Sequence, residues 1–266
     1  MNTETSKGTA LLTGASSGIG AVYADRLARR GYDLILVARD PQRLQSLSRH
    51  LAEKTGRKVE PLQADLTVTA DMHRVEQRLA TDDTITMLVN NAGLGATAPL
   101  IDSSADAMET MIQLNVVALT RLTRAALPGL LARGRGIVVN IASIVALAPE
   151  LLNGVYGGTK SYVLSFTQSL HHEVGSKGVQ VQAVLPGAIS TPFWDRAGLP
   201  VEHLPAQIVM QADELVDAAL SGLDQGELVT IPSLPDVAQW NTFMAARLAM
   251  GPNLSLQKAA QRYQRG

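Results

Sequence analysis

The sequence predicts an α/β fold: a doubly wound, parallel, seven-stranded sheet that carries helices on both faces. Short runs of Leu and β-branched residues alternate with longer helical patterns, which is typical of a parallel sheet covered on both sides. A glycine-rich turn joins the first run to the first helical pattern. No Pro- or Gly-rich linker and no internal repeat interrupts the alternation, so the sequence predicts a single domain over residues 1–266.

Seven strands are expected, in order, from short runs of apolar and β-branched residues. They span Thr9–Thr13, Asp33–Ala38, Lys58–Gln63, Thr86–Val89, Gly136–Ile141, Val179–Val184 and Leu228–Ile231. The first helix is the clearest, because Ile19, Tyr23 and Leu27 recur every fourth residue on one face. Gly31 follows where a left-handed C-terminal cap is expected, so the connection to the second strand should be tight.

Two segments depart from this alternation. Residues 190–210 contain three prolines and much apolar surface, and long irregular inserts in compact domains are usually binding loops or lids. We therefore expect a substrate lid there. The tail, residues 235–266, has Trp240, Phe243 and Leu248 at roughly helical spacing. It predicts a helix that packs on the core or on another subunit.

Composition excludes several classes of function. The formal net charge is -1 and no long stretch carries one sign, which argues against nucleic-acid and anionic-membrane partners. The absence of Cys excludes disulfides and thiolate sites, and adjacent His171 and His172 point in different directions on a helix, so no metal site is expected. The polar residues 1–7 do not resemble a signal peptide, and polar residues interrupt the apolar stretch 136–152. We expect a soluble, cytoplasmic protein.

A loop of small residues follows the first strand directly and leads into the first helix. Glycines there permit a sharp turn and a close approach of the backbone to a pyrophosphate, whose charge the helix N-terminus stabilises. Such a loop can be a plain turn, but its place between a first strand and a helix favours dinucleotide binding. The residues concerned are Gly14, Ser16, Ser17, Gly18, Ile19 and Gly20.

The spacing of these glycines is three residues and then one. It resembles the Thr-Gly-x-x-x-Gly-x-Gly loop of the short-chain dehydrogenase/reductase family. The resemblance extends from about Thr9 to Ile231, and further motifs follow in the family's order. It implies a Rossmann-like fold and an enzyme that transfers a hydride between NADP(H) and a carbonyl or alcohol carbon.

The end of the second strand bears on the choice of cofactor. A guanidinium pairs with a 2′-phosphate through two charge-assisted bonds, whereas a carboxylate accepts from a free 2′-hydroxyl. Ala38 stands where NAD-using members have Asp, and Arg39 follows it, so NADP is favoured, with Ser16 as an additional phosphate contact. The alternative is that Arg39 is a solvated surface charge and that Asp40 binds the ribose.

Two further motifs match the adenosine side of the cofactor site. Asp65 ends the third strand, where the family has an acidic residue beside the adenine; it could equally cap a turn. The run Asn90-Asn91-Ala92-Gly93 matches the family's Asn-Asn-Ala-Gly motif. Its amides can bridge neighbouring strand ends, and Gly93 leaves room for the cofactor. We expect Asn91, Ala92 and Gly93 to form both a cofactor wall and a clasp within the sheet.

The candidate catalytic residues are Tyr156 and Lys160, which are four residues apart and so share a helix face. A cation beside a phenol favours the phenolate, so we expect Lys160 to lower the pKa of Tyr156. Alone, the pair would be ordinary surface residues. The resemblance implies that Tyr156 exchanges a proton with the substrate oxygen and that Lys160 also binds the nicotinamide ribose.

Three other positions complete the predicted site. Ser143 ends the fifth strand, where its hydroxyl can stabilise charge on the substrate oxygen. Asn115 lies within a helix, where Asn is unfavourable, and the family's residue there holds a water that feeds protons to the lysine. Each could also be an ordinary structural residue. In the family's Pro-Gly segment against the nicotinamide, the matching positions are Pro186, Gly187, Ile189 and Thr191; a plain turn is the alternative.

The substrate is expected to be a small carbonyl or alcohol compound of hydrophobic character, because many apolar side chains surround the predicted site. They are Val145, Leu147, Leu151, Leu152, Phe193, Trp194, Leu199, Leu204, Ile208 and Met210. The alternatives are an NADP-binding sensor or scaffold without turnover, and a nucleotide-sugar epimerase, for which the tail is too short. The resemblance also implies a homodimer or homotetramer that assembles through the helices around Asn115 and Tyr156.

Overall fold

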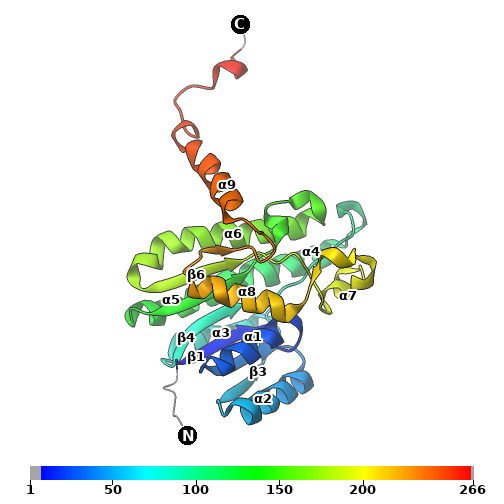
Figure 1. Cartoon of the computed structure of the whole chain (residues 1–266), viewed down its shortest axis with the longest axis vertical. Coiled ribbons are helices and arrows are strands. Elements are labelled where there is room, and N and C mark those ends of the chain that lie inside the picture. Colours follow the sequence, from blue (N-terminus) through cyan, green and yellow to red (C-terminus); the bar gives the residue numbers. More distant parts are fainter. Residues whose placement is uncertain (1–6, 265–266) are drawn as a thin grey trace. The chain divides into compact units, whose positions relative to one another are not determined.

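The computed structural model describes residues 7–264, and its main element is a seven-stranded parallel sheet (Figure 1). The strands are β1 (Thr9–Thr13), β2 (Asp33–Ala38), β3 (Val59–Gln63), β4 (Ile85–Asn90), β5 (Gly136–Ile141), β6 (Val179–Val184) and β9 (Val229–Thr230). Their order across the sheet is β3-β2-β1-β4-β5-β6-β9. The predicted fold class and all seven predicted strands are confirmed, with ends displaced by one residue at most.

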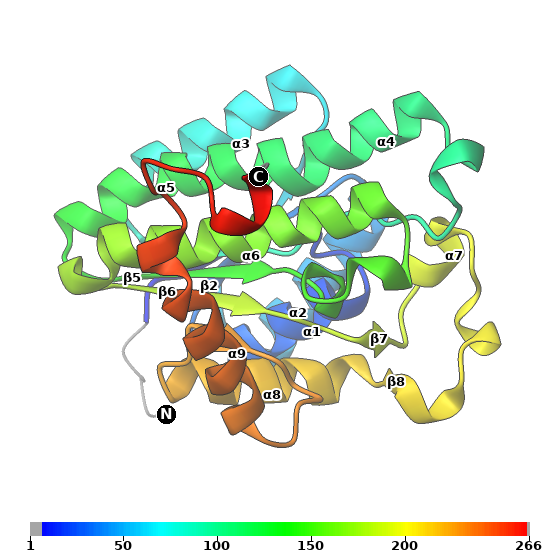
Figure 2. The same cartoon turned by 90° about the horizontal axis from the view of Figure 1, so that it is seen from above.

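Helices cover both faces of this sheet (Figure 2). On one face lie α1 (Gly18–Arg29), α2 (Pro41–Thr55) and α8 (Ala212–Asp224); on the other lie α3 (Thr69–Thr81), α5 (Leu119–Ala132) and α6 (Gly154–Val174). Successive strand side chains point to opposite faces. Accordingly, Ala10 and Leu12 of β1 enter the core under α1, whereas Leu11 enters the core under α3 and α5. None of the helices in residues 7–264 is long and apolar enough to cross a membrane.

The order of the strands determines where a ligand can bind. The strands β1, β2 and β3 follow one another toward one edge of the sheet, and β4 then lies on the other side of β1. In open α/β sheets, ligands bind in the crevice at the carboxyl ends of the strands, beside such a reversal. The loops after β1 and β4 meet there: the Asn91 amide donates to the carbonyl oxygens of Thr13 and Gly14 at 2.9 and 3.1 Å.

The segment predicted as a lid, residues 190–210, and the two residues before it form short elements rather than one long loop. They are the paired strands β7 (Ala188–Ile189) and β8 (Val209–Met210), and between them α7 (Phe193–Ala197) with two 3-10 turns. A further helix, α4 (Ala105–Ile112), leads into a π-helical segment, Gln113–Ala118, that continues into α5.

The chain separates into two compact units, one that ends at Pro232 and one that begins at Ser233. The second unit contains α9 (Val237–Ala249), in agreement with the predicted helix around Trp240 and Leu248. Asp236 caps this helix by accepting from the Ala238 amide, and the rings of Trp240 and Phe243 lie 5.5 Å apart.

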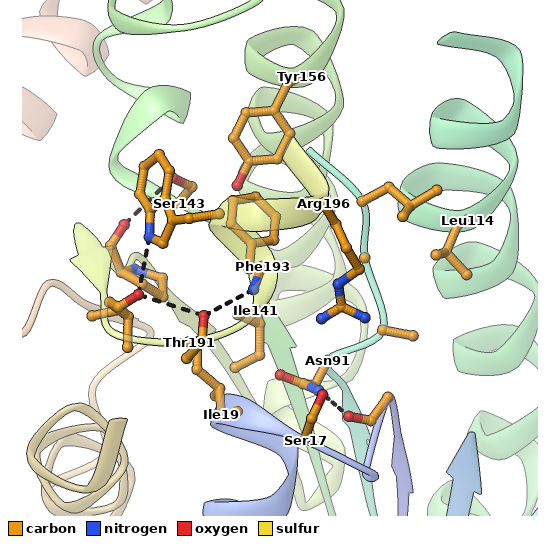
Figure 3. Close-up of a pocket in the computed structure, with 18 of the residues that line it drawn as sticks. Ser17, Ile19, Asn91, Leu114, Ile141, Ser143, Tyr156, Thr191, Phe193 and Arg196 are labelled. Carbon is orange, nitrogen blue, oxygen red and sulfur yellow. Dashed lines mark hydrogen bonds between the residues drawn. The ribbon is translucent and has the colours of Figure 1, made fainter. Parts of the chain in front are cut away.

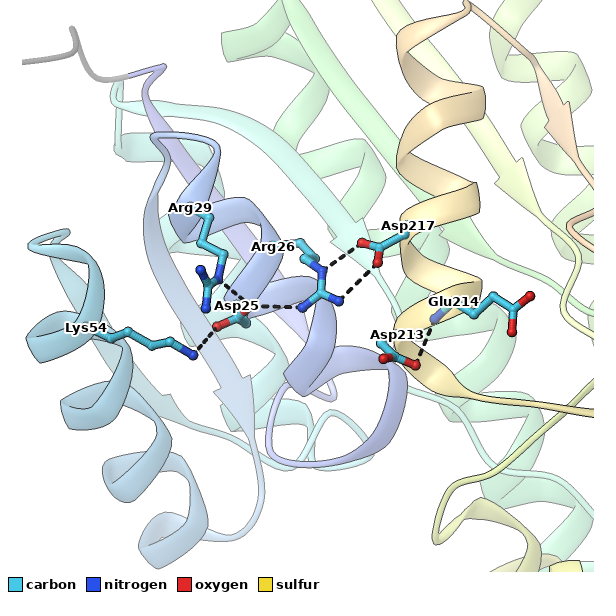
Figure 4. A network of polar contacts seen from close by, with 7 residues as sticks. All are labelled: Asp25, Arg26, Arg29, Lys54, Asp213, Glu214 and Asp217. Atoms are coloured by element: carbon cyan, nitrogen blue, oxygen red, sulfur yellow. Dashed lines mark hydrogen bonds and ion pairs between the residues drawn. The ribbon is translucent and has the colours of Figure 1, made fainter.

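A network of charged side chains joins α1, α2 and α8 (Figure 4). The Arg26 guanidinium donates to both carboxylate oxygens of Asp217, at 2.7 and 3.0 Å. Arg26 also pairs with Asp25, which accepts further from Arg29 and Lys54. The hydrogen bond from Arg26 lowers the pKa of the Asp217 carboxyl. Arg26 and Asp217 are 191 residues apart in the sequence, so this pair connects α1 to the distant helix α8.

Substituting Asp217→Asn is expected to lower the free energy of unfolding by about 0.5–1 kcal/mol at neutral pH, as for other exposed ion pairs. Because the folded pKa of Asp217 is depressed, its contribution is complete above the unfolded pKa and is lost as the pH falls through the folded value. Urea unfolding at neutral pH and at about pH 2 checks this. Glu214→Gln is the control, since Glu214 lies on the same helix and points away from the network (Figure 4); an equal loss there would contradict the prediction.

Candidate active site

A cavity of about 840 Å³ opens at the carboxyl edge of the sheet. It brings together residues from β1, β2, β4, β5, α6 and the lid segment. The predicted site residues that line it are Gly14, Ser16, Ser17, Gly18, Ile19, Arg39, Asp65, Asn91, Ala92, Gly93, Ser143, Tyr156, Lys160, Pro186, Gly187, Ile189 and Thr191. Two predicted residues, Gly20 and Asn115, lie behind this lining.

The glycine loop turns sharply between β1 and α1. Gly14 and Gly18 adopt positive φ angles of 65° and 53°, which side chains rarely tolerate. A Cβ on Gly20 would lie 2.2 Å from the carbonyl oxygen of Gly14, so the helix can start this close to the loop only with glycine at that position. The Ser17 side chain makes no capping bond to α1, which leaves the helix N-terminus available to an anion.

The end of β2 presents a cation to the same cavity. Arg39 has its nearest carboxylate, Asp65, 3.9 Å away, and its side chain is 58% exposed. Asp40 has another role: its carboxylate accepts from the backbone amides of Gln42 and Arg43, both at 3.0 Å, and so caps α2. The geometry therefore favours Arg39 over Asp40 as the residue that meets an adenosine ribose.

Asp65 lines the cavity and also stabilises its own turn. Its carboxylate accepts from the Thr67 amide at 2.9 Å and from the Thr67 hydroxyl at 2.7 Å. Burial alone would raise the pKa of this carboxyl, but the two bonds from Thr67 and the charge of Arg39 hold it below its ordinary value. The turn-capping alternative is thus present in the structure together with the cavity position.

The Asn90-Asn91 motif joins three strands. The Asn90 amide donates to Asn140 of β5 and to Thr123 of α5, both at 2.9 Å, while Asn91 reaches back to the end of β1. The predicted clasp within the sheet is therefore present. It fixes the distance between the glycine loop and the strand that precedes Ser143.

Tyr156 and Lys160 share the buried face of α6, near its N-terminus. Asn153 caps the helix by accepting from the amides of Val155 and Tyr156. The Ser143 side chain lines the same cavity, and its hydroxyl lowers the pKa of the Tyr156 phenol. The Lys160 ammonium donates to the Ile141 carbonyl oxygen at 2.8 Å and lies 5.8 Å from the centre of the Tyr156 ring. Three of the four predicted catalytic residues thus converge at the cavity floor.

The expected lowering of the pKa of Tyr156 is wrong for this arrangement. Burial raises the pKa of Tyr156 to about 12, and the hydrogen bond with Ser143 offsets only part of the rise. Burial also lowers the pKa of Lys160 to about 8. The main cause is the burial of the phenol, and the Lys160 ammonium is directed at a backbone carbonyl rather than at the phenol oxygen. In this arrangement the phenol keeps its proton at neutral pH and is a proton donor.

Asn115 occupies the π-helical segment and holds the backbone behind the cavity. Its Nδ2 donates to the Leu94 carbonyl at 2.8 Å and to the Thr159 hydroxyl at 3.0 Å, while its Oδ1 accepts from the Leu94 amide at 2.8 Å. A Cβ on Gly93 would lie 3.2 Å from that Oδ1 and 3.6 Å from the Lys160 nitrogen. Asn115 therefore faces the back of the lysine site, with one Oδ1 lone pair still unused by these bonds.

The Pro-Gly segment after β6 lies against Ser143. The Pro186 carbonyl accepts from the Ser143 hydroxyl at 3.4 Å and from the Ile144 amide at 3.0 Å. Thr191 packs close to Gly18 of the glycine loop, where a Cβ would approach it to 3.1 Å. The segment thus crosses from Ser143 to the glycine loop.

Seven of the ten apolar residues predicted to surround the substrate line the cavity: Val145, Leu151, Leu152, Phe193, Trp194, Leu204 and Ile208. The other three do not. Met210 packs against the core under α8, and Leu147 and Leu199 lie outside the lining. Their sequence positions predicted proximity, but which way each side chain points depends on the short turns of this region.

The family model described as short chain dehydrogenase matches residues 8–199. The chain belongs to this family. Among curated proteins, an uncharacterized oxidoreductase of Staphylococcus epidermidis is 31% identical over 223 residues, which cover 84% of this chain and 93% of that protein.

Two solved structures of family members are similar over almost the whole chain. A short-chain dehydrogenase from Sphingobium yanoikuyae, in complex with NADPH, is 49% identical with a TM-score of 0.94, and the match covers 97% of this chain and 100% of that one. A bulky-bulky ketone specific alcohol dehydrogenase from Comamonas testosteroni is 44% identical with a TM-score of 0.91, over 98% and 100%.

Sequence reasoning missed several residues that line the cavity of this short-chain dehydrogenase. Arg43 is one; it stands four residues after Arg39, and that spacing could have indicated a second cation. Arg196 of the lid is another, and Figure 3 shows its guanidinium directed toward Asn91 and Ser17. Leu94 and Leu114 add apolar surface; neither lies in a motif that could have indicated it.

Proposed function

We propose that this protein is an NADP-dependent oxidoreductase that interconverts a hydrophobic ketone and its secondary alcohol. The observation that carries the proposal is the buried Tyr156 phenol, which lies with Ser143 and Lys160 at the floor of a largely apolar cavity. A group that keeps its proton at neutral pH and points into such a cavity is a suitable acid for a carbonyl oxygen.

The residues of the cavity fit NADP. The sharp glycine loop has no room for side chains at Gly20, and the α1 N-terminus is available to a diphosphate. Arg39 and Arg43 would meet a 2′-phosphate, since both line the cavity and Arg39 is mostly exposed. The NADPH complex of the Sphingobium yanoikuyae relative supports the same choice.

The chain's own residues account for the proton in the reaction. When bound, NADP(H) supplies or accepts the hydride. In reduction, Ser143 hydrogen-bonds the substrate oxygen and stabilises the negative charge that develops there, while Tyr156 donates its proton to that oxygen. Lys160 places a positive charge within 6 Å of the phenol ring, which favours the phenolate that forms when the proton leaves.

The alternative, an NADP-binding sensor or scaffold without turnover, has less support. Such a protein has no need for a serine, tyrosine and lysine held together at the cavity floor, because these groups do not contribute to binding the adenosine half of the cofactor. Here all three are buried and line the cavity. Burying an amine and a phenol is costly, and catalysis gives a reason for it.

A hydrophobic ketone is the substrate class that the cavity fits best. Apolar side chains from the loop before α6, such as Val145 and Leu152, and Phe193 of the lid segment form the end next to Tyr156. The similar Comamonas testosteroni enzyme is specific for bulky-bulky ketones. A panel of carbonyl compounds, followed at the nicotinamide absorbance, tests the class. Equal kcat/KM values for polar and apolar compounds would contradict it.

The cofactor proposal is tested by titrating the protein with NADPH and with NADH and following nicotinamide fluorescence. Substituting Arg39→Leu removes a charge-assisted contact worth about 1.5–3 kcal/mol, so the Kd for NADPH should rise about tenfold to a hundredfold. The Kd for NADH should stay unchanged, because NADH has no 2′-phosphate. Tighter binding of NADH than of NADPH by the unmodified protein would overturn the proposal.

The two directions of the reaction should depend on pH in opposite ways. Tyr156 has a pKa of about 12 and Lys160 one of about 8. Ketone reduction should therefore be level near neutral pH and fall as the pH rises through about 8, where Lys160 loses its charge. Alcohol oxidation should rise with pH, because the phenol must first lose its proton. Profiles of kcat/KM from about pH 6 to about pH 10 check this; parallel profiles would contradict it.

A further inference from the structure

The lid helix α7 is fixed to the loop that follows β4. The amide and the hydroxyl of Thr97 both donate to the Ala197 carbonyl, at 3.1 and 2.9 Å. At the other end of the helix, the buried Trp194 indole donates to the Ile189 carbonyl at 2.9 Å. Because both ends of α7 are held, the position of Phe193, its first residue, is well defined.

The Phe193 ring rests directly on Gly95. A Cβ built on Gly95 would lie 2.2 Å from Cζ of this ring and 2.8 and 3.2 Å from its two Cε atoms, and these are the three nearest atoms. Real side chains do not approach this closely. The ring therefore uses the space that the missing side chain of Gly95 leaves.

The same ring also lies beside the proposed acid. Its centre is 5.9 Å from that of Tyr156 and 5.6 Å from that of Trp194, which it meets edge-on. Phe193 packs against the apolar cluster of Met111, Val145 and Tyr156, and Figure 3 shows it next to the Tyr156 hydroxyl. Phe193 lines the cavity, whereas Gly95 does not. A ring displaced from Gly95 would consequently move into the cavity.

This arrangement bears on the two substituents of a ketone. A carbonyl carbon holds its substituents in one plane, on either side of the oxygen that meets Tyr156 and Ser143. The lining offers apolar side chains for one substituent, among them Leu151, Leu204 and Ile208. The Phe193 ring, which lines the cavity beside Tyr156, would then bound the space for the other.

We propose that Phe193 limits the size of the second ketone substituent, and that Gly95 enlarges this space by letting the ring withdraw from the cavity. The pair determines specificity and takes no part in the chemistry. This inference rests on the proposed function, because it assumes a ketone whose oxygen meets Tyr156.

A double-mutant cycle with two matched ketones tests the proposal. Cyclohexyl methyl ketone and dicyclohexyl ketone differ only in the second substituent, so the ratio of their kcat/KM values reports on the space beside Phe193. The ratio is taken as kcat/KM for dicyclohexyl ketone divided by kcat/KM for cyclohexyl methyl ketone. Phe193→Ala should raise it about tenfold or more, since space for a single CH₂ group changes selectivity by about tenfold. Gly95→Ala should lower it about tenfold, because the ring is pushed into the cavity.

The double variant shows whether Gly95→Ala acts through the Phe193 ring or through a general disturbance of the structure. Without the ring, a Cβ at position 95 loses its three nearest contacts, so Phe193→Ala with Gly95→Ala should have the ratio of Phe193→Ala alone. An equal tenfold loss from Gly95→Ala in both backgrounds, or no change of ratio with Phe193→Ala, would overturn the proposal. Phe166→Ala is the matched control: Phe166 stacks on Tyr162, outside the lining, and its loss should leave the ratio unchanged.

A binding measurement separates this proposal from the proposed function. Dissociation constants of the two corresponding alcohols, measured with the cofactor present, should shift with the same signs as the kinetic ratio. If the unmodified protein reduces neither ketone, the proposed function fails. The dissociation constants of the two alcohols then still test the role of Phe193. Equal constants in all four proteins would overturn it. The Kd for NADPH should remain unchanged in each variant.

Discussion

Substituting Tyr156→Phe is expected to lower kcat for ketone reduction by about 10²- to 10⁴-fold, the usual contribution of a positioned acid. The phenol is buried and has a pKa of about 12, so it holds the proton that the substrate oxygen needs. Phenylalanine keeps the ring and its packing against Phe193 but has no proton to give. Single-turnover rates under saturating NADPH measure the effect on the chemical step.

Tyr162→Phe is the matched control for this experiment, because it removes the same hydroxyl from the same helix. Tyr162 bonds Thr120 at 2.8 Å and lies outside the cavity lining, so its loss should leave kcat unchanged. Both variants should keep the Kd for NADPH within about twofold. A Tyr156→Phe protein with normal turnover would show that another group supplies the proton.

Substituting Gly20→Ala is expected to destabilise the protein by about 2 kcal/mol, within the range for overpacked cores, and to raise the Kd for NADPH about tenfold or more. The new methyl group would lie 2.2 Å from the Gly14 carbonyl oxygen and 2.6 Å from the Asn91 amide nitrogen. The carbonyl belongs to the backbone and cannot swing aside, so the loop and α1 must move apart. That movement displaces the backbone amides at the helix N-terminus and so weakens anion binding there.

Gly154→Ala separates this clash from the general effect of a glycine substitution. Gly154 begins α6, and a Cβ there would meet nothing within 4 Å. The Gly154→Ala protein should be as stable as the unmodified one, or slightly more, because alanine loses less backbone entropy on folding. Urea unfolding and NADPH titration are measured on both. A Gly20→Ala protein with unchanged stability and affinity would contradict the packing argument.

The fold could be predicted from the sequence because its signals are local. Each buried strand is a short apolar run, and the first helix repeats its apolar residues every fourth position, so all seven strands and α1 lie where expected. The candidate site could be predicted from the sequence for a similar reason. In a parallel sheet, residues that end successive strands meet at one edge, which is why Arg39, Asn91 and Ser143 line the same cavity.

The properties that depend on contacts between distant segments could not be predicted. The sequence favoured a lowered pKa for Tyr156, but the burial of the phenol raises it instead. Likewise, Leu147 and Leu199 are apolar and close to the site in sequence, yet their side chains do not reach the cavity. Short turns determine where such side chains point, and spacing along the chain does not encode this.

The sequence alone determined the class of fold, and it predicted the phosphate loop, a cation for a 2′-phosphate and the residues of the proposed proton transfer. Each depends on residue type and short-range spacing, which fix periodicity, turns and strand ends. Only the tertiary structure decided that Asp40 caps a helix, that Tyr156 keeps its proton, and that Phe193 rests on Gly95 beside it. Those outcomes depend on burial and on distances between segments that are far apart in the chain, and these exist only once the core is packed.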